Sequence, residues 1–274
     1  MVQFDGRLFN VPQPGLFEAG SSWMSRLALA QGASLSEVLK LFRLIGHVDL
    51  DRRLRGNRLA QIRRVCGLPN SALAIHERVM TSLESMHPVG EHYLAQTESN
   101  RPRFRFCPQC LSEMRSPHFP IHWRFIAWRW CSVHDCLLED TCPNCARPTS
   151  FPTDIATSKA GRLGYAMLNR CLSCGQRLDR ITPCYLQIDG FRRVSRLEQM
   201  ILENGRALLA ALYHGWFSIE GRRGHFQLSK LKEIERNGGL PMRLDWLPSE
   251  KVRLRKPVGE RFGLSDWNAF MNDD

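Results

Sequence analysis

Apolar residues near the start of the chain recur at the three- and four-residue spacing of amphipathic helices. Residues 16–28 carry one such stripe, with Ser21 or Ser22 in position to cap the helix and Gly32 in position to end it. Ser34 follows as the cap of a second helix. The pattern therefore predicts a helical N-terminal region.

A second pair of helices is predicted farther along this region. Apolar residues place one helix over 58–66, and Gly67 follows it. The next helix is expected to begin with Asn70 or Ser71 as its cap. Helix, short glycine-containing turn and helix form the outline of a helix-turn-helix, which many helical domains share.

Beyond residue 100 the composition and the apolar spacing change twice. Residues 101–187 are dense in Cys, Trp and Pro and lack long periodic segments, which predicts short strands and tight turns. Helical spacing returns over 194–214 and, more briefly, over 227–236. We expect three regions: a helical domain over 1–100, a loop-rich region over 101–187, and a C-terminal helical segment and tail over 188–274.

The net charge of the chain indicates its partners, and its hydropathy indicates where it is located. Lys and Arg number 38 against 27 Asp and Glu, a formal net charge of +11, and 32 of the 38 are arginine. Such a chain is attracted to nucleic acid or to an acidic protein partner. No apolar run approaches a membrane span and no secretory signal is recognisable, so we expect an intracellular protein.

Two arginine clusters are the candidate contacts for nucleic acid or a partner. Arginines that neutralise phosphates give affinity that is independent of sequence and sensitive to salt. A solvated surface is the alternative for such runs. The candidates in the N-terminal helical region are Arg52, Arg53, Arg55, Arg58, Arg63 and Arg64. Those at the start of the predicted C-terminal helix are Arg192, Arg193 and Arg196.

Four pairs of metal-ligand residues, each with a two-residue gap, fill the loop-rich region. Such a gap lets a tight turn direct both side chains at one ion, and in a reducing compartment clustered cysteines hold metal more often than they form disulfides. The pairs are Cys107 and Cys110, Cys131 and His134, Cys142 and Cys145, and Cys171 and Cys174. We therefore predict two zinc ions and an α-rich fold with small zinc-ribbon elements.

The spacing leaves two questions about these sites. Sequential and interleaved pairing differ little in loop entropy, and sequential pairing follows the usual spacing of zinc ribbons. Cys136, two residues after His134, competes with it as a ligand, although His134 keeps the two-residue gap. In either arrangement protein side chains complete the coordination of each ion, as in structural rather than catalytic zinc sites.

Three tryptophans lie between the first two ligand pairs. Trp123, Trp128 and Trp130 alternate with arginines, so they have two interpretations: core packing in a small zinc module, or stacking on nucleic-acid bases. Core packing is favoured because small zinc modules need large aromatic residues to complete their interior.

The ligand pairs and their neighbours resemble one known family. The resemblance is carried by Phe106, Cys107, Pro108, Cys110, Trp123, Arg124, Cys131, His134, Leu137, Leu138, Cys142, Pro143 and Cys145, and near the start by Pro14, Glu18, Ser22, Trp23, Ser25, Arg26 and Ala28. With these residues the chain resembles TniQ, the family of transposon target-selection proteins that includes TnsD, over about residues 10–180.

The resemblance implies a non-catalytic adaptor in DNA transposition. Such proteins recruit a AAA+ ATPase of the TnsC or TniB kind, which brings the transposase. Some bind a DNA attachment site directly, whereas others are carried by a CRISPR effector such as Cascade with its guide RNA and form homodimers. Only about 90 residues follow the zinc region here, in place of the long extension of TnsD-type members, which favours recruitment by another complex.

Two other functions remain as alternatives. A stand-alone zinc-containing DNA-binding regulator would hold a defined duplex without partners. An enzyme acting on phosphate esters would need clustered carboxylates, and Asp49 and Asp51 are the only close acidic pair in the helical region. The expected location is the bacterial cytoplasm, in association with the nucleoid.

Overall fold

The first part of the chain forms five helices, which are the four that the apolar spacing predicts and a short one, Leu50–Arg53, that it does not. A computed structural model describes residues 7–46, 49–87, 89–131, 133–151, 153, 167–185, 187–188, 191–192, 195–219, 223–236 and 254–255. The five helices are α1 (Gly20–Ala30), α2 (Leu35–Leu41), α3 (Leu50–Arg53), α4 (Gly56–Cys66) and α5 (Ala74–Ser85).

Short elements follow in the Cys-rich region, again as predicted. They are η1 (Val89–Tyr93), β1 (Arg103–Phe104), α6 (Pro108–Glu113), η2 (Ile121–Arg124), β2 (Trp130–Cys131), β3 (Cys136–Leu137), β4 (Thr149–Ser150) and η3 (Leu178–Arg180). Strands β1 and β4 pair antiparallel, and so do β2 and β3. Each strand has two residues, which is the scale of a zinc ribbon rather than of an independent sheet.

The C-terminal part returns to helix. Its elements are β5 (Gln187–Ile188), β6 (Phe191–Arg192), α7 (Arg196–His214), β7 (Trp216–Ile219), β8 (Phe226–Gln227), α8 (Leu228–Arg236) and β9 (Leu254–Arg255). Strands β5 and β6 pair with each other, and β7 lies between β8 and β9 in a three-stranded antiparallel sheet. Both helices predicted here are confirmed, within two residues of their expected starts.

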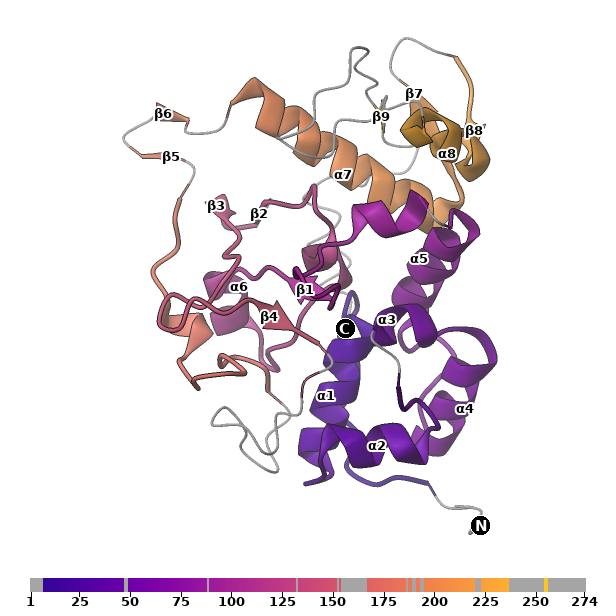
Figure 1. Cartoon of the computed structure of the whole chain (residues 1–274), viewed down its shortest axis with the longest axis vertical. Helices are drawn as coiled ribbons and strands as arrows, with labels where there is room; N and C mark the ends of the chain where they lie inside the picture. The colour runs from indigo at the N-terminus through magenta and orange to yellow at the C-terminus, as the bar shows by residue number, and fades with distance from the viewer. Residues whose placement is uncertain are drawn as a thin grey trace.

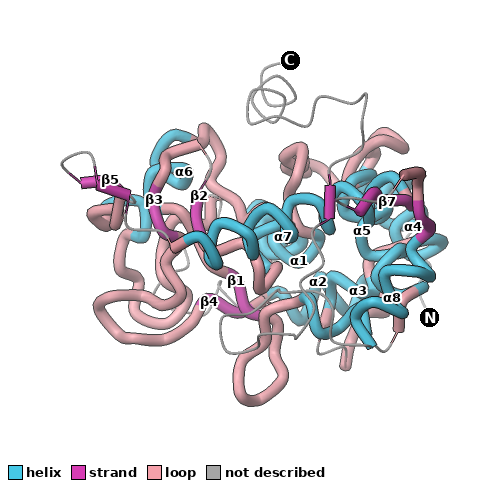
Figure 2. The backbone as a smooth tube through the Cα atoms, turned by 90° about the horizontal axis from the view of Figure 1, so that it is seen from above, coloured by secondary structure: helices cyan, strands magenta, loops and turns pink. Residues whose placement is uncertain are grey.

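The parts are arranged around α7. In Figure 1 the helices α1–α5 lie on one side and the Cys-rich elements on the other, with α7 running across the top. Figure 2, seen from above, places β2, β3 and α6 toward one end and α4, α5 and α8 toward the other. The Arg78 guanidinium on α5 lies 5.0 Å from the ring centre of Tyr213 on α7, a cation–π contact between the two helices.

Several predicted helix ends are confirmed. Ser34 caps α2 in a capping box with Glu37, whose carboxylate accepts from the Ser34 backbone N–H at 2.7 Å. Gly32 has a φ of 62° just after α1. Gly67 has a φ of 63° just after α4 and caps that helix. These left-handed conformations are those that glycine adopts without steric cost.

Two predicted caps are wrong. Ala19 is the N-cap of α1, and Ser21 and Ser22 lie buried inside its first turn, where their hydroxyls donate to carboxylates. The helix α5 begins at Ala74 rather than after Asn70 or Ser71, because Leu73 takes a left-handed conformation with a φ of 58° that ends the preceding turn. The helix-turn-helix interpretation of α4 and α5 stays a prediction.

Two hydrophobic clusters form the interior of the described chain. One belongs to α1–α4 and includes Trp23, Leu27 and Ile62. The other contains residues of α5, the Cys-rich region and α7 together, so all three predicted regions contribute to it. Gly205 of α7 approaches so closely that an added Cβ would lie 2.7 Å from the Ala127 Cβ. The division into separate domains stays a prediction.

The three tryptophans belong to the second cluster. Trp123, Trp128 and Trp130 are 1%, 2% and 5% exposed. Trp123 meets Phe119 edge to face, with ring centres 5.5 Å apart. Their burial confirms the core interpretation and leaves no ring face free to stack on a base.

His122 lies inside this aromatic core and makes stability depend on pH. Its ring centre is 4.7 Å from that of Trp128, and burial lowers its pKa to about 3. In the unfolded chain the pKa is about 6.5, so between these values the unfolded state binds more protons and acid favours unfolding. The free energy of unfolding should therefore fall by about 2 kcal/mol between pH 7 and pH 5 because of this one residue.

The measurement is urea unfolding at both pH values for wild type and for His122→Gln. The variant should show a smaller loss between pH 7 and pH 5, by about the 2 kcal/mol assigned to His122. His92→Gln is the matched control because His92 is exposed. An unchanged pH dependence in His122→Gln would contradict the prediction.

Candidate metal centres

The first candidate centre brings together the first two predicted ligand pairs. The donor atoms of Cys107, Cys110, Cys131 and His134 all lie within 4.8 Å of one another. Cys107 is the N-cap of α6 and Cys110 lies in its first turn, where the Cys110 N–H donates to the Cys107 sulfur at 3.3 Å. Cys131 ends β2, and His134 lies in the turn between β2 and β3.

The second candidate centre brings together the other two pairs. The sulfur atoms of Cys142, Cys145, Cys171 and Cys174 also lie within 4.8 Å of one another. Each pair lies in a tight turn, and in each turn a backbone N–H four residues after the first cysteine donates to its carbonyl, from Ala146 to Cys142 at 2.8 Å and from Gly175 to Cys171 at 2.9 Å. The structure thus groups the pairs sequentially and not in the interleaved way.

The spacing between donor atoms fits tetrahedral zinc. Zinc bonds of about 2.3 Å to sulfur and 2.0–2.1 Å to nitrogen place two sulfurs about 3.8 Å apart and sulfur and nitrogen about 3.6 Å apart. The Cys142–Cys174 and Cys145–Cys171 sulfur separations are 3.7 and 3.6 Å. In the first centre Cys110 and Cys131 are 3.5 Å apart. Each group could therefore hold one zinc ion, with no position left open for a substrate.

His134 presents its two ring nitrogens to different partners. Its Nδ1 lies 3.4, 3.2 and 3.5 Å from the sulfurs of Cys107, Cys110 and Cys131. Its Nε2 lies 2.7 Å from a carboxylate oxygen of Glu113 at the end of α6. A carboxylate on the far nitrogen is the usual outer partner of a zinc-bound histidine, and it fixes Nδ1 as the atom that faces the metal. The sequence analysis missed Glu113.

The charge environment suits metal binding. Hydrogen bonding from the Cys110 thiol lowers the pKa of Cys107 to about 6, and hydrogen bonding from the Asn144 side chain lowers that of Cys174 to about 6. Burial lowers the pKa of His134, but hydrogen bonds to Cys107 and to other partners outweigh it and raise the pKa to about 11. Histidine and cysteine bind zinc in their deprotonated forms, so acid should release the metal from this centre.

Cys136 remains beside the first centre. Its side chain is fully buried, and its sulfur lies 3.6 Å from that of Cys107. The structure groups His134, and not Cys136, with the other three donors within 4.8 Å, as the two-residue gap predicts, while Cys136 lies next to that group.

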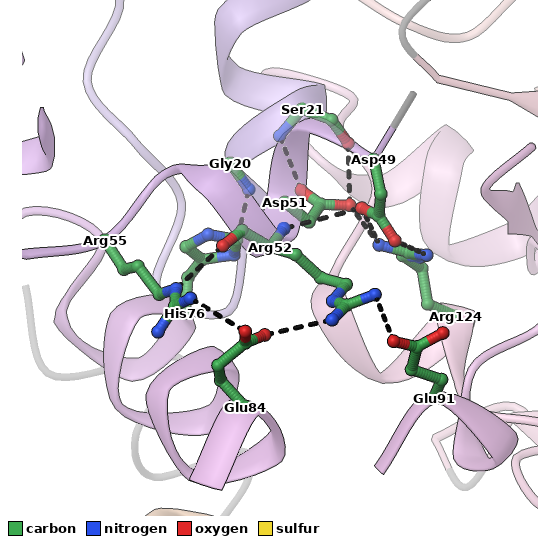
Figure 3. Close-up of polar contacts among 10 residues, drawn as sticks. All are labelled: Gly20, Ser21, Asp49, Asp51, Arg52, Arg55, His76, Glu84, Glu91 and Arg124. Atoms are coloured by element: carbon green, nitrogen blue, oxygen red, sulfur yellow. Dashed lines mark hydrogen bonds and ion pairs between the residues drawn. The ribbon is translucent and has the colours of Figure 1, made fainter. Parts of the chain in front are cut away.

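A buried charge network joins the helical region to the Cys-rich region. Figure 3 shows the guanidinium of Arg124 between the carboxylates of Asp49 and Asp51. Arg124 donates to both oxygens of Asp49 at 2.9 Å and to Asp51 at 2.8 Å. Asp51 also accepts from the backbone N–H and the hydroxyl of Ser21. Burial raises the pKa of Asp49, but the Arg124 guanidinium outweighs it and keeps that pKa below its ordinary value.

A second buried network makes the same connection. Arg26 donates to Glu18 at 2.6 Å and to the hydroxyl of Ser116 at 2.8 Å. Ser22 donates to Glu18 and accepts from the backbone N–H of Phe119 at 3.0 Å. Four of the residues that carried the resemblance, Glu18, Ser22, Arg26 and Arg124, are thus among those that join α1 and α3 to the segment between the first two ligand pairs.

The arginine candidates divide into paired and free side chains. Arg52 pairs with Glu84 and Glu91, Arg55 with Glu84, and Arg63 with Glu77. The side chains of three others are exposed and enter no ion pair or hydrogen bond within the described part of the chain: Arg53, Arg58 and Arg64.

The C-terminal arginine candidates are only partly placed. Arg192 ends β6 and Arg196 begins α7, where the structure describes the backbone. Arg193 lies outside the described residues. The second predicted cluster therefore stays a prediction.

Comparison with known proteins gives a family. Residues 10–138 match the TniQ family model, a stretch that includes the first centre, both buried networks and Cys136. The second centre lies beyond the match. No curated protein matches the chain. No described helix has the length and apolar character needed to cross a membrane. Through residues 10–138 the chain belongs to the TniQ family, which implies a role in target selection during DNA transposition.

Proposed function

We propose that this protein is a non-catalytic target-selection adaptor. It links target DNA, or a complex that has recognised the target, to a AAA+ ATPase of the TnsC or TniB kind and so to the transposase. The observation that carries the proposal is the TniQ match over residues 10–138. Support also comes from the buried networks, because they use the same residues that characterise the family resemblance.

The adaptor acts in the bacterial cytoplasm at the nucleoid, with target recognition supplied by another complex. A CRISPR effector such as Cascade, with its guide RNA, is the partner that the resemblance favours, and a homodimer is the proposed assembly. The proposal rests on the family and on the net charge of +11, which suits association with nucleic acid.

The non-catalytic part of the proposal is supported by the kind of donors present. Within the described residues, the groups able to hold a metal are the two sets rich in sulfur, which leave no open coordination position. Asp49 and Asp51, the acidic pair considered for phosphate-ester chemistry, are occupied by Arg124. We propose two structural zinc ions, one held by Cys107, Cys110, Cys131 and His134 and one by Cys142, Cys145, Cys171 and Cys174.

The adaptor proposal is tested by recovery of partners. Tagged protein would be purified from cells that express its genomic neighbours, with zinc measured on the same sample. Recovery of a AAA+ ATPase or a CRISPR effector is the expected result. A protein that recovers neither, but holds a defined DNA duplex at nanomolar strength by itself, would instead be a DNA-binding regulator.

We further propose that Arg53, Arg58 and Arg64 contact DNA phosphates or an acidic partner. Arg58 and Arg64 are exposed on α4, outside its buried face, which includes Leu59 and Ile62. Their guanidinium groups are free to bind an anion, whereas Arg52, Arg55 and Arg63 are held by glutamates.

Replacing these three arginines with glutamine should weaken DNA binding in a salt-dependent way. Each lost phosphate contact reduces the slope of log affinity against log salt by about 0.9 in magnitude. The slope of the triple variant should therefore be smaller than that of wild type by up to about 2.7. Fluorescence anisotropy across a salt series measures this slope. The matched control changes the exposed Arg101, Arg115 and Arg147 to glutamine. Equal slopes for the two triple variants would contradict the assignment of the DNA contact to Arg53, Arg58 and Arg64.

A further inference from the structure

The position of Cys136 at the first centre is set by strand pairing. Cys131 and Cys136 are directly opposite each other in the β2–β3 pair. Residues directly opposite in an antiparallel pair have side chains on the same face of the sheet, with Cβ atoms about 4.5–5.5 Å apart. As long as this pair of strands forms, the sulfur of Cys136 stays beside that of Cys131.

The distance between the Cys136 and Cys107 sulfurs is typical of two thiolates that bind one metal ion. The Cys136 and Cys107 sulfurs are 3.6 Å apart, as are those of Cys145 and Cys171 in the second centre. This is close to the edge of a zinc–thiolate tetrahedron, about 3.8 Å. Cys136 is thus at a ligand-to-ligand distance from Cys107, although it lies outside the four donors that are all within 4.8 Å of one another.

The turn that carries His134 is more exposed than the strand that carries Cys136. It lies in the turn between β2 and β3, where Val133 is 50% exposed and Asp135 has a φ of 48°. The partner of its Nε2, Glu113, has a side chain that is 56% exposed. Cys136, in contrast, lies in a strand and is fully buried. The His134 side chain itself is 8% exposed, so a change at the protein surface would first reach its turn and its partner Glu113.

We propose that Cys136 is a reserve ligand that replaces His134, converting the first centre from three cysteines and one histidine to four cysteines. In this exchange the bond from zinc to Nδ1 of His134 breaks and a bond from zinc to the sulfur of Cys136 forms. The proton of the Cys136 thiol passes to the released Nδ1 or to water. The ion stays bound while the turn that carries His134 becomes free to rearrange. This inference rests on the proposed zinc ligands and not on the adaptor role, so either can fail alone.

The test compares the two donors singly and together. Four variants are purified with Co²⁺ in place of zinc: His134→Ala, Cys136→Ser, the double variant, and Cys184→Ser as a control with an exposed cysteine. Metal content, the intensity of the visible d–d bands and the thiolate-to-cobalt charge-transfer band report how many ions are tetrahedral and how many sulfurs bind them. Both single variants should keep two tetrahedral ions per chain, and His134→Ala should gain charge-transfer intensity from its added sulfur.

The double variant should behave differently from either single one. With three donors left, its first centre should bind Co²⁺ at least about 10-fold more weakly than that of His134→Ala, since loss of an outer partner alone costs 10–100-fold. The inference is overturned if His134→Ala binds as weakly as the double variant. It is equally overturned if His134→Ala fails to fold while Cys136→Ser folds, or if Cys136→Ser alone loses the ion.

Glu113 provides a variant that keeps all five donors. Glu113→Gln removes the charge that holds His134, so a folded protein should show increased charge-transfer intensity, because part of the population exchanges His134 for Cys136. Arg115→Gln, which removes a charge at an exposed position just beyond α6, should leave the spectrum of the first centre unchanged. A Glu113→Gln spectrum identical to that of wild type would count against the exchange.

Discussion

Replacing Arg124 with methionine is expected to destabilise the protein by about 3–5 kcal/mol at pH 7, which is the usual cost of removing one partner of a buried ion pair. Arg124 and Asp51 are both fully buried, and Asp49 is 17% exposed. Methionine fills much of the same volume but donates no hydrogen bond, so two carboxylates are left without their cation. Urea unfolding at pH 7 measures the change.

The pH dependence of this loss identifies its cause. In wild type the pKa of Asp49 is below its ordinary value, so its contribution to stability is present at neutral pH and lost as pH falls. In Arg124→Met the unpaired carboxylates have raised pKa values, and protonation in acid relieves their repulsion and desolvation. The difference between variant and wild type should therefore be largest at pH 7 and smaller at pH 5.

Two further variants separate charge from packing. Arg124→Met combined with Asp49→Asn and Asp51→Asn should recover part of the stability, because the buried charges are then removed together. Arg124→Lys should recover little, since an ammonium group lacks the planar fork that reaches both carboxylates. Arg115→Met, at an exposed position, is the control. A loss below about 1 kcal/mol in Arg124→Met would show that the network contributes little to stability.

Local sequence patterns predicted the helices well and the long-range polar contacts poorly. Apolar spacing and the signals at Gly32, Ser34 and Gly67 describe contacts within a few residues, which is why those ends were found. Ser21 and Ser22 look like caps from their neighbours alone. Ser22 also donates to the nearby Glu18, but the other partners, Asp51 for Ser21 and the backbone of Phe119 for Ser22, are 30 and 97 positions away along the chain.

The same contrast between local patterns and long-range contacts applies to the candidate metal centres. Paired ligands with a two-residue gap are a local signal, so all eight predicted donors come together in two groups. The choice between His134 and Cys136, and the role of Glu113, depend on how β2, β3 and α6 approach one another. No spacing rule connects Glu113 to His134, which lies 21 positions later. Only the folded arrangement brings that pair within hydrogen-bonding distance.

Removing the metal should unfold the Cys-rich region altogether. Structural zinc contributes about 10–16 kcal/mol in small zinc modules at pH 7, which equals or exceeds the whole stability of a typical domain. The strands here have two residues each, and the cysteines lie in the same hydrophobic cluster as Trp123 and Trp128. A chelator should therefore abolish the near-ultraviolet circular dichroism of these tryptophans.

The N-terminal helices should respond less. The cluster formed by α1–α4 is separate and contains Trp23, Leu27 and Ile62. Part of the far-ultraviolet helical signal should survive chelation, although the contacts of Arg26 and Arg124 with the Cys-rich region are then lost. Complete loss of helix at the same chelator concentration would mean that the two clusters form one cooperative unit.

Ligand variants assign the effect to each centre. Cys107→Ser combined with Cys136→Ser, which leaves the first centre three donors, should lose the first ion, and Cys142→Ser should lose the second. Each should become poorly soluble because the region around its centre has little core of its own. Cys184→Ser, at an exposed cysteine outside both groups, should keep two zinc ions. If the Cys107→Ser, Cys136→Ser double variant or Cys142→Ser retains full zinc content and normal solubility, the proposed ligands are wrong. Loss of only the corresponding ion from each variant would support two separate structural sites.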